Sequence, residues 1–204
     1  AQRGVEADWE GLADAWRAGY GPIMRRVEDG ELPRQPIDAL HRSLLDELLP
    51  RFGLEDLREE DRTHLNLVWH RLDAWPDVRP GLERLRPHFT VAPLSNGNTS
   101  LLIDLARQAD LRWDCILSAE LQGHFKPHPE EYRSAARVLA LQPHRILMVA
   151  AHNNDLAAAA DAGFRTAFVY RTTEHGPGQT TDLEPLPGLD LAVRDLEELP
   201  GAVT

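Results

Sequence analysis

The spacing of apolar residues changes near residue 75, and this change limits what the chain can fold into. Before it, apolar residues recur every three or four positions, the period of a helix with one buried face. After it, short runs rich in β-branched residues alternate with helical stretches. Such alternation indicates a parallel sheet covered by helices. We expect two modules, a helical one over residues 1–75 and an α/β one over residues 76–204.

The helical module contains three apolar stripes, at residues 9–27, 37–48 and 65–72. Prolines and a glycine separate them and end the helices. We find no strand signal in this part of the chain.

The α/β module shows five short apolar runs that are typical of buried strands. We expect these strands at residues 89–94, 115–117, 146–150, 166–170 and 189–193, with 146–150 the clearest. Helices are expected between them, at residues 80–86, 99–108, 129–139 and 156–162.

Composition narrows the classes of partner. The net charge of −11 argues against nucleic acid and anionic membranes, which require a basic face. A small anionic substrate is still compatible with the negative net charge, because a pocket can be locally positive. No apolar run approaches the roughly 20 residues of a membrane span, and no signal peptide is visible. With Cys115 as its one cysteine the chain forms no internal disulfide, so we expect a cytoplasmic location.

Three polar loops follow the expected strands. They are Ser95-Asn96, the stretch around Lys126, and residues 152–155. In open α/β sheets the ligand site lies beyond the carboxyl ends of the strands. We therefore expect the three loops to meet at one edge of the sheet.

Each of these residues has a structural explanation beside a functional one. Ser95 and Asn96 suit a turn and a helix cap, or an anion site at a helix N-terminus. Lys126 is either a solvated charge or a charge fixed by the prolines around it. Tyr132 either packs in the core or supports the site.

The same two explanations apply to the remaining candidates. His152 and Asp155 suit helix capping, yet a carboxylate at a strand end also suits acid–base or orienting work. Arg17 is either a solvated helix residue or an anion clamp, for which a guanidinium is well shaped.

Five short motifs can be read along the chain: Trp-Arg at 16–17, Ser-Asn-Gly at 95–97, Phe-Lys-Pro-x-Pro-x-x-Tyr at 125–132, Ala-Ala-His-x-x-Asp-Leu at 150–156 and Ala-Gly-Phe-Arg-Thr at 162–166. Together and in this order, they resemble the haloacid dehalogenase (HAD) superfamily, and within it the type II (L-2-haloacid) dehalogenases. This resemblance implies a HAD-like, Rossmann-like parallel sheet with a helical cap domain.

The resemblance also implies a reaction, the hydrolysis of short-chain 2-haloacids to 2-hydroxyacids. An Asp carboxylate attacks the halogen-bearing carbon, halide leaves, and water hydrolyses the resulting ester. Lys126, Asp155, Ser95 and Tyr132 would be catalytic: Lys126 keeps the nucleophile ionised, Tyr132 supports that lysine, Asp155 positions the water, and Ser95 binds a carboxylate. No cofactor and no metal are expected.

The same resemblance implies that four more residues bind the substrate. Arg17 would meet the substrate carboxylate or the leaving halide, and Asn96 a carboxylate. His152 stands where this branch often has Asn, and Asn154 where a bulky aromatic or apolar residue is usual. The partners implied are a small anionic haloacid and its halide, and the apolar helical stripes would suit a homodimer.

One departure from the family concerns the nucleophile itself. The superfamily places that Asp in an Asp-x-x-Gly-Thr motif at the end of the first core strand, and this chain has no such motif. Residues 1–8 already resemble the segment after that strand. We expect the nucleophile to lie upstream of this chain, and residues 1–204 without it would be inactive.

Two other functions stay open. A magnesium-dependent phosphatase of the same superfamily would have acidic ligands where Ala150 and Ala151 stand, although Asp155 is kept. An inactive homologue that binds a partner or dimerises would also fit. In the dehalogenase hypothesis, Ser95 and Lys126 must converge with Asp155 where a carboxylate from the leading strand would fit.

Overall fold

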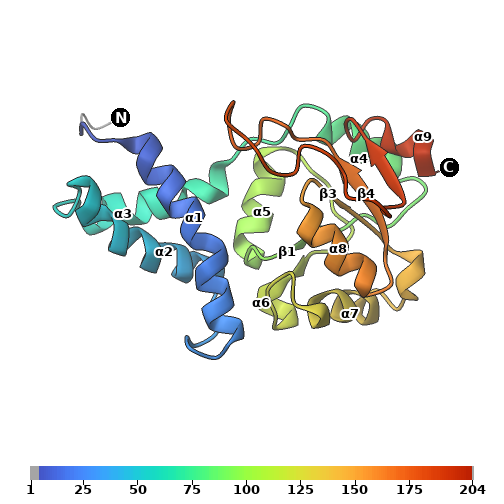
Figure 1. The fold of residues 1–204 in the computed structure, drawn as a ribbon, viewed down its shortest axis with the longest axis horizontal. Helices are drawn as coiled ribbons and strands as arrows, with labels where there is room; N and C mark the ends of the chain where they lie inside the picture. The colour runs from blue at the N-terminus through green and yellow to red at the C-terminus, as the bar shows by residue number, and fades with distance from the viewer. Residues whose placement is uncertain (1–4, 204) are drawn as a thin grey trace.

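The structure is a computed structural model that describes residues 5–203. Residues 1–4 of the segment expected to follow the first core strand, and residue 204, lie outside the described residues. Figure 1 shows two parts side by side, a group of helices formed by the first third of the chain and a larger α/β part formed by the rest.

The helical part, called the cap below, is built from three α-helices. Helix α1 spans Trp9–Glu28, α2 spans Ile37–Leu48 and α3 spans Glu59–Asn66, while short 3-10 helices η1 (Leu49–Phe52) and η2 (Leu67–Arg71) extend α2 and α3. The third stripe thus falls mostly on η2 instead of on one regular helix, and two of its residues, Val68 and Leu72, are exposed.

Helix α1 packs in two directions along its length. Leu12 and Trp16, in its first half, join a core that lies within the cap. Ile23, Met24 and Val27, in its second half, belong to a core shared with the α/β part. One long amphipathic helix therefore attaches the cap to the core while holding the cap together.

The centre of the cap holds a buried histidine, His41. His41 is 4% exposed, and neither ring nitrogen has a hydrogen-bond partner among the described residues. Its ring stacks on Trp69 at 4.8 Å, and its carbonyl accepts a hydrogen bond from Trp16 Nε1 at 2.9 Å. Burial lowers the pKa of His41 to about 4 despite the nearby Asp38, so the ring is neutral at pH 7.

The α/β part, called the core domain, alternates strands and helices as expected. Its elements are α4 (Val78–Leu85), β1 (Leu94–Ser95), α5 (Thr99–Gln108), β2 (Leu117–Ser118), α6 (Ala119–Gln122), α7 (Pro129–Val138), η3 (Pro143–Arg145), β3 (Leu147–Ala150), α8 (Asn153–Asp161), β4 (Arg165–Val169), β5 (Leu191–Val193) and α9 (Leu199–Val203). The hydrophobic periodicity of the sequence did not predict α6 and α9, because these helices are too short to show a helical period. Strand β1 begins only at Leu94, because residues 89–93 pair with no strand in a ladder.

All strand pairs are parallel, but within residues 5–203 they form two separate ladders. Strand β1 pairs with β2, and β3 pairs with β4, which pairs with β5. Strands β1 and β3 therefore each have one edge without a ladder partner among the described residues.

The larger sheet has two covered faces. Phe168 points to the side packed by α7 and α8, whereas Ala167 and Val169 point to the side packed by α4 and α9. This alternation is the period of a strand. It makes β4 the most buried strand of the sheet, whereas residues 146–150 were expected to be the clearest strand and only Met148 there is buried.

The polar loops after β1 and β3 come to the same end of the core domain, where α1 of the cap also lies. In Figure 1 α1 runs alongside α5, and apolar residues of its second half share a core with residues of α5 and α6. No helix among residues 5–203 is both long and apolar enough to cross a bilayer.

Candidate active site

Lys126 lies in the loop between α6 and α7, and a side-chain amide holds its backbone. Asn96 Oδ1 accepts a hydrogen bond from the Lys126 amide at 2.6 Å, and Asn96 Nδ2 donates to the Lys126 carbonyl at 3.2 Å. Both hydrogen-bonding groups of this residue's backbone are thus bound by one side chain. This arrangement fixes the start of the lysine side chain.

The Lys126 ammonium contacts a carboxylate that follows β3. Its Nζ lies 2.6 Å from Asp155 Oδ2, and the two side chains are 15% and 12% exposed. Asp155 stands in the first turn of α8, where the helix dipole favours a negative charge. Lys126 is also the only lysine among the 22 Lys and Arg residues of the chain. A compact primary amine, rather than another guanidinium, is used at this position.

Tyr132 completes this group from α7. Its hydroxyl donates to Asp155 Oδ1 at 2.6 Å, and its ring is fully buried edge-on to Phe164. Burial, reinforced by the negative charge of Asp155, raises the pKa of Tyr132 far above the ordinary range. The hydroxyl is therefore a hydrogen-bond donor at any working pH and not a base.

Two residues of the cap contact the same amide. The Tyr20 side chain lies beside Asn96, and Asn96 Nδ2 donates to Met24 Sδ at 3.3 Å. Burial raises the pKa of Tyr20 to about 12, although the Asn96 amide opposes the rise. Sequence reasoning counted Tyr20 as part of an apolar stripe and did not find this role.

Ser95 lies at the end of β1, next to Asn96, but its hydroxyl is used inside its own turn. The Ser95 Oγ accepts from the Gly97 amide at 3.0 Å, and Ser118 Oγ donates to the Gly97 carbonyl at 2.7 Å. Within residues 5–203 no hydrogen bond joins Ser95 to the Lys126 group. The expected turn is therefore formed, and Ser95 borders the site through its neighbour.

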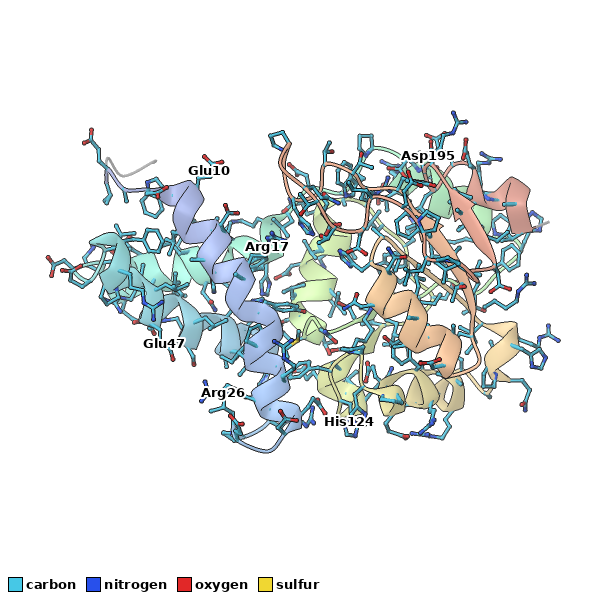
Figure 2. The ribbon with its side chains drawn as sticks, in the orientation of Figure 1. Glu10, Arg17, Arg26, Glu47, His124 and Asp195 are labelled. Atoms are coloured by element: carbon cyan, nitrogen blue, oxygen red, sulfur yellow. The ribbon has the colours of Figure 1, made fainter. Side chains whose placement is uncertain are left out.

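Arg17 contacts the core domain instead of lying free on α1. Its NH1 lies 2.8 Å from Nδ1 of His175, in the loop after β4, and Figure 2 shows Arg17 on the part of α1 that faces the core domain. The cap and the core domain therefore meet both here and at Asn96.

His152 follows β3 and pairs with the same loop. Its Nε2 lies 3.1 Å from Glu174 Oε2. The hydrogen bond to Glu174 raises the pKa of His152, opposed by burial, and the same bond lowers the pKa of Glu174. His152 thus has a carboxylate partner that the sequence pattern did not reveal.

Asn154 is exposed, and its Oδ1 accepts from the Asp155 amide at 2.9 Å. This is a local turn contact. The preceding residue, Asn153, has the larger structural role, because its side chain donates to the Glu184 carbonyl and accepts from the Leu186 amide. Asn153 thereby ties a long loop to the start of α8.

Two groups of histidines and carboxylates in residues 5–203 could hold a metal ion. One is Glu28, His124 and His128, and the other is His152, Glu174 and His175. Neither includes the Lys126–Asp155 pair.

The chain as a whole is similar to known proteins. The model of the haloacid dehalogenase-like hydrolase family matches residues 9–163. The (S)-2-haloacid dehalogenase of Xanthobacter autotrophicus is 33% identical over 109 residues, which are 52% of this chain and 43% of that protein. The phosphoglycolate phosphatase of Nitrosospira multiformis is 27% identical over 157 residues, 69% of each chain. The chain thus spans less than half the length of the first of these relatives.

Solved structures resemble nearly the whole chain. A crystal structure of an L-2-haloacid dehalogenase is 44% identical, with a TM-score of 0.95 over 98% of this chain and 85% of that one. A defluorinating L-2-haloacid dehalogenase is 39% identical, with a TM-score of 0.95 over 98% and 83%. The Xanthobacter autotrophicus enzyme with chloropropionic acid covalently bound is 26% identical, with a TM-score of 0.81 over 95% and 86%.

Proposed function

This chain belongs to the haloacid dehalogenase-like hydrolase family, and we propose that its protein hydrolyses short-chain 2-haloacids to 2-hydroxyacids. The observation that carries the proposal is the largely buried group formed by Lys126, Asp155 and Tyr132, with Asn96 behind it. This group offers a fixed ammonium beside a fixed carboxylate, and no part of it requires a metal. The L-2-haloacid dehalogenases of similar structure support the same reaction.

The attacking carboxylate, in this proposal, comes from an Asp on a strand that precedes residue 1. The edges of β1 and β3 that have no ladder partner within residues 5–203 support such a strand, because the loops that follow these two strands are already joined through Asn96, Lys126 and Asp155. A parallel strand added between them would end beside the Lys126 ammonium. That ammonium would then keep the new carboxylate ionised.

The reaction has two balanced steps. A carboxylate oxygen bonds to C2 of the substrate while the carbon–halogen bond breaks and halide leaves with its electron pair. Water then adds to the carbonyl carbon of the ester, which releases the 2-hydroxyacid, a proton and the original carboxylate. Arg17 would hold the substrate carboxylate, which requires it to exchange His175 for the substrate. Asp155 would orient the water.

A phosphatase of the same family is the second candidate, favoured by the phosphoglycolate phosphatase similarity. Its magnesium ion would need oxygen ligands near the end of β3. Ala150 and Ala151 offer none from their side chains, and the Asp155 carboxylate is occupied by Lys126 and Tyr132. The dehalogenase is therefore the better supported of the two.

The test is halide release by the full-length protein. We expect chloride from L-2-chloropropionate without added metal and with EDTA present. Fluoroacetate forms a second arm, read with a fluoride electrode, because one similar structure is of a defluorinating enzyme. A metal requirement, or turnover of a phosphomonoester in place of the haloacid, contradicts the proposal. No turnover of either substrate supports an inactive homologue.

Matched substitutions test the residue assignments. Lys126→Ala and Asp155→Ala should each abolish halide release while circular dichroism remains native, and Asp155→Asn replaces the second if it fails to fold. The controls are Arg145→Ala, an exposed cation, and Asp161→Ala, an exposed carboxylate at the other end of α8. Activity retained without Lys126 or Asp155 refutes the assignment.

A further inference from the structure

A second cluster of ligating side chains, which does not include the Lys126–Asp155 pair, lies where the cap meets the core domain. Glu28 stands at the last position of α1, and His124 and His128 flank the loop that carries Lys126. One ligand atom from each of the three lies within 4.8 Å of the others. Figure 2 shows His124 near the end of α1, at the lower edge of the molecule.

We propose that Glu28, His124 and His128 bind one divalent transition-metal ion of the zinc class, which fastens the cap to the Lys126 loop. Two imidazoles and a carboxylate are the ligand set of three-residue zinc sites, which leave one position for water. Magnesium and calcium prefer oxygen ligands, so the histidines select against them.

Glu28 and His124 are close to ligating positions already. Glu28 Oε2 lies 2.9 Å from His124 Nδ1, a few tenths of an ångström short of the separation that two ligands of one tetrahedral zinc ion adopt. The other Glu28 oxygen accepts from the Phe125 amide at 2.7 Å and from Arg34 at 3.1 Å. Glu28 is therefore held in place by one oxygen and offers the other.

His128 must turn to complete the site. Its ring stacks on that of His124 with centroids 4.0 Å apart and planes 9° apart, whereas shared coordination requires both ring planes to converge on the ion. Its Nδ1 accepts a 3.2 Å hydrogen bond from the Glu130 amide. Coordination through Nδ1 would exchange this long bond for a metal–nitrogen bond.

An independent observation indicates that a cation is favourable here. Glu131, in the next helix, has no exposed surface, and neither of its carboxylate oxygens has a hydrogen-bond partner among the described residues. Burial raises the pKa of Glu131 to about 7; the charge of Lys126 opposes the rise, and the negative charge of Glu28 adds to it. A buried carboxylate without a partner is costly, and a bound cation beside Glu28 reduces the repulsion between the two carboxylates.

The ion would act on cap closure and not on the chemistry. Glu28 belongs to α1, which also carries Tyr20 on Asn96, while His124 and His128 bracket Lys126. Clamping these segments restricts their relative motion. Zinc should raise the thermal unfolding midpoint of metal-free protein, while the EDTA-resistant halide release of the proposed function continues.

The experiment is a calorimetric titration of EDTA-stripped full-length protein with ZnCl2, with the visible absorption of Co²⁺ as a second readout. It uses the His175→Ala background, which disables the other cluster of ligating residues. We expect one site per chain. His124→Gln, and His128→Asn, which keeps a helix-capping side chain, should each raise the dissociation constant roughly 10-fold or more.

If either histidine variant fails to fold, Glu28→Gln takes its place and should weaken zinc binding in the same way. The matched control is His144→Gln, which removes an exposed histidine. No saturable binding, or binding unchanged by His124→Gln and His128→Asn, overturns the proposal. Because binding and the unfolding midpoint are measured without substrate, failure here is distinct from failure to release halide.

Discussion

The buried His41 should make the protein lose stability in mild acid, and His41→Phe should remove that loss. Burial holds the pKa of His41 at about 4, against 6.5 for an exposed histidine. The unfolded chain therefore binds the proton more tightly than the folded one, so stability is complete above pH 6.5 and declines as the pH falls from 6.5 through about 4. Phenylalanine keeps a flat ring against Trp69 and does not titrate.

The size of the effect follows from the shift. Each pH unit between the two pKa values costs about 1.4 kcal/mol. Between pH 7 and pH 5 only the part below 6.5 counts, so the contribution of His41 falls by about 2 kcal/mol. Other groups titrate in both proteins, and their effects cancel in the difference between wild type and variant.

The assay is urea unfolding at pH 7, 6 and 5, followed by circular dichroism. We expect the stability gap between wild type and His41→Phe to shift by about 2 kcal/mol in favour of the variant from pH 7 to pH 5. His144→Gln, which removes an exposed histidine, should follow wild type. Parallel pH curves for wild type and His41→Phe would refute the reasoning, because they would mean that His41 is not kept neutral by burial.

Two further predictions concern the Lys126–Asp155 pair. Tyr132→Phe removes one charge-assisted hydrogen bond, so we expect the free energy of unfolding to fall by about 1.5–3 kcal/mol. The variant should have a kcat that is lowered less than by Lys126→Ala, and its pH–rate profile should be unshifted. A shifted profile would mean that the tyrosine transfers protons. Asn96→Ala frees the Lys126 backbone, so kcat should fall while KM changes little; a raised KM with normal kcat would instead identify Asn96 as a substrate ligand.

Periodicity located the longer elements well. The helix expected at residues 99–108 is α5 with the same bounds, since a ten-residue helix with one buried face imposes its period on the sequence. Strand β1 was expected at residues 89–94 but begins at Leu94. Whether an apolar run is a strand depends on whether a neighbouring strand pairs with it, and local sequence does not contain that information.

For the candidate site too, some features could be predicted from local sequence and others could not. The sequence by itself determined which residue types stand in the loops after the strands, because turns, caps and motifs are local patterns. Lys126 and Asp155 could be singled out in this way. Their 2.6 Å contact, however, is between residues 29 positions apart in the chain.

The tertiary structure alone decided the partners across the cap and the core domain. Three contacts depend on how the cap sits on the core domain. They are Tyr20 with Asn96, Arg17 with His175, and Glu28 with His124 and His128. That placement depends on the shared apolar packing along α1 and on the loops that the core domain presents to it. Contacts of this kind follow from three-dimensional packing, and the hydrophobic period along the chain contains no information about which distant segments pack together.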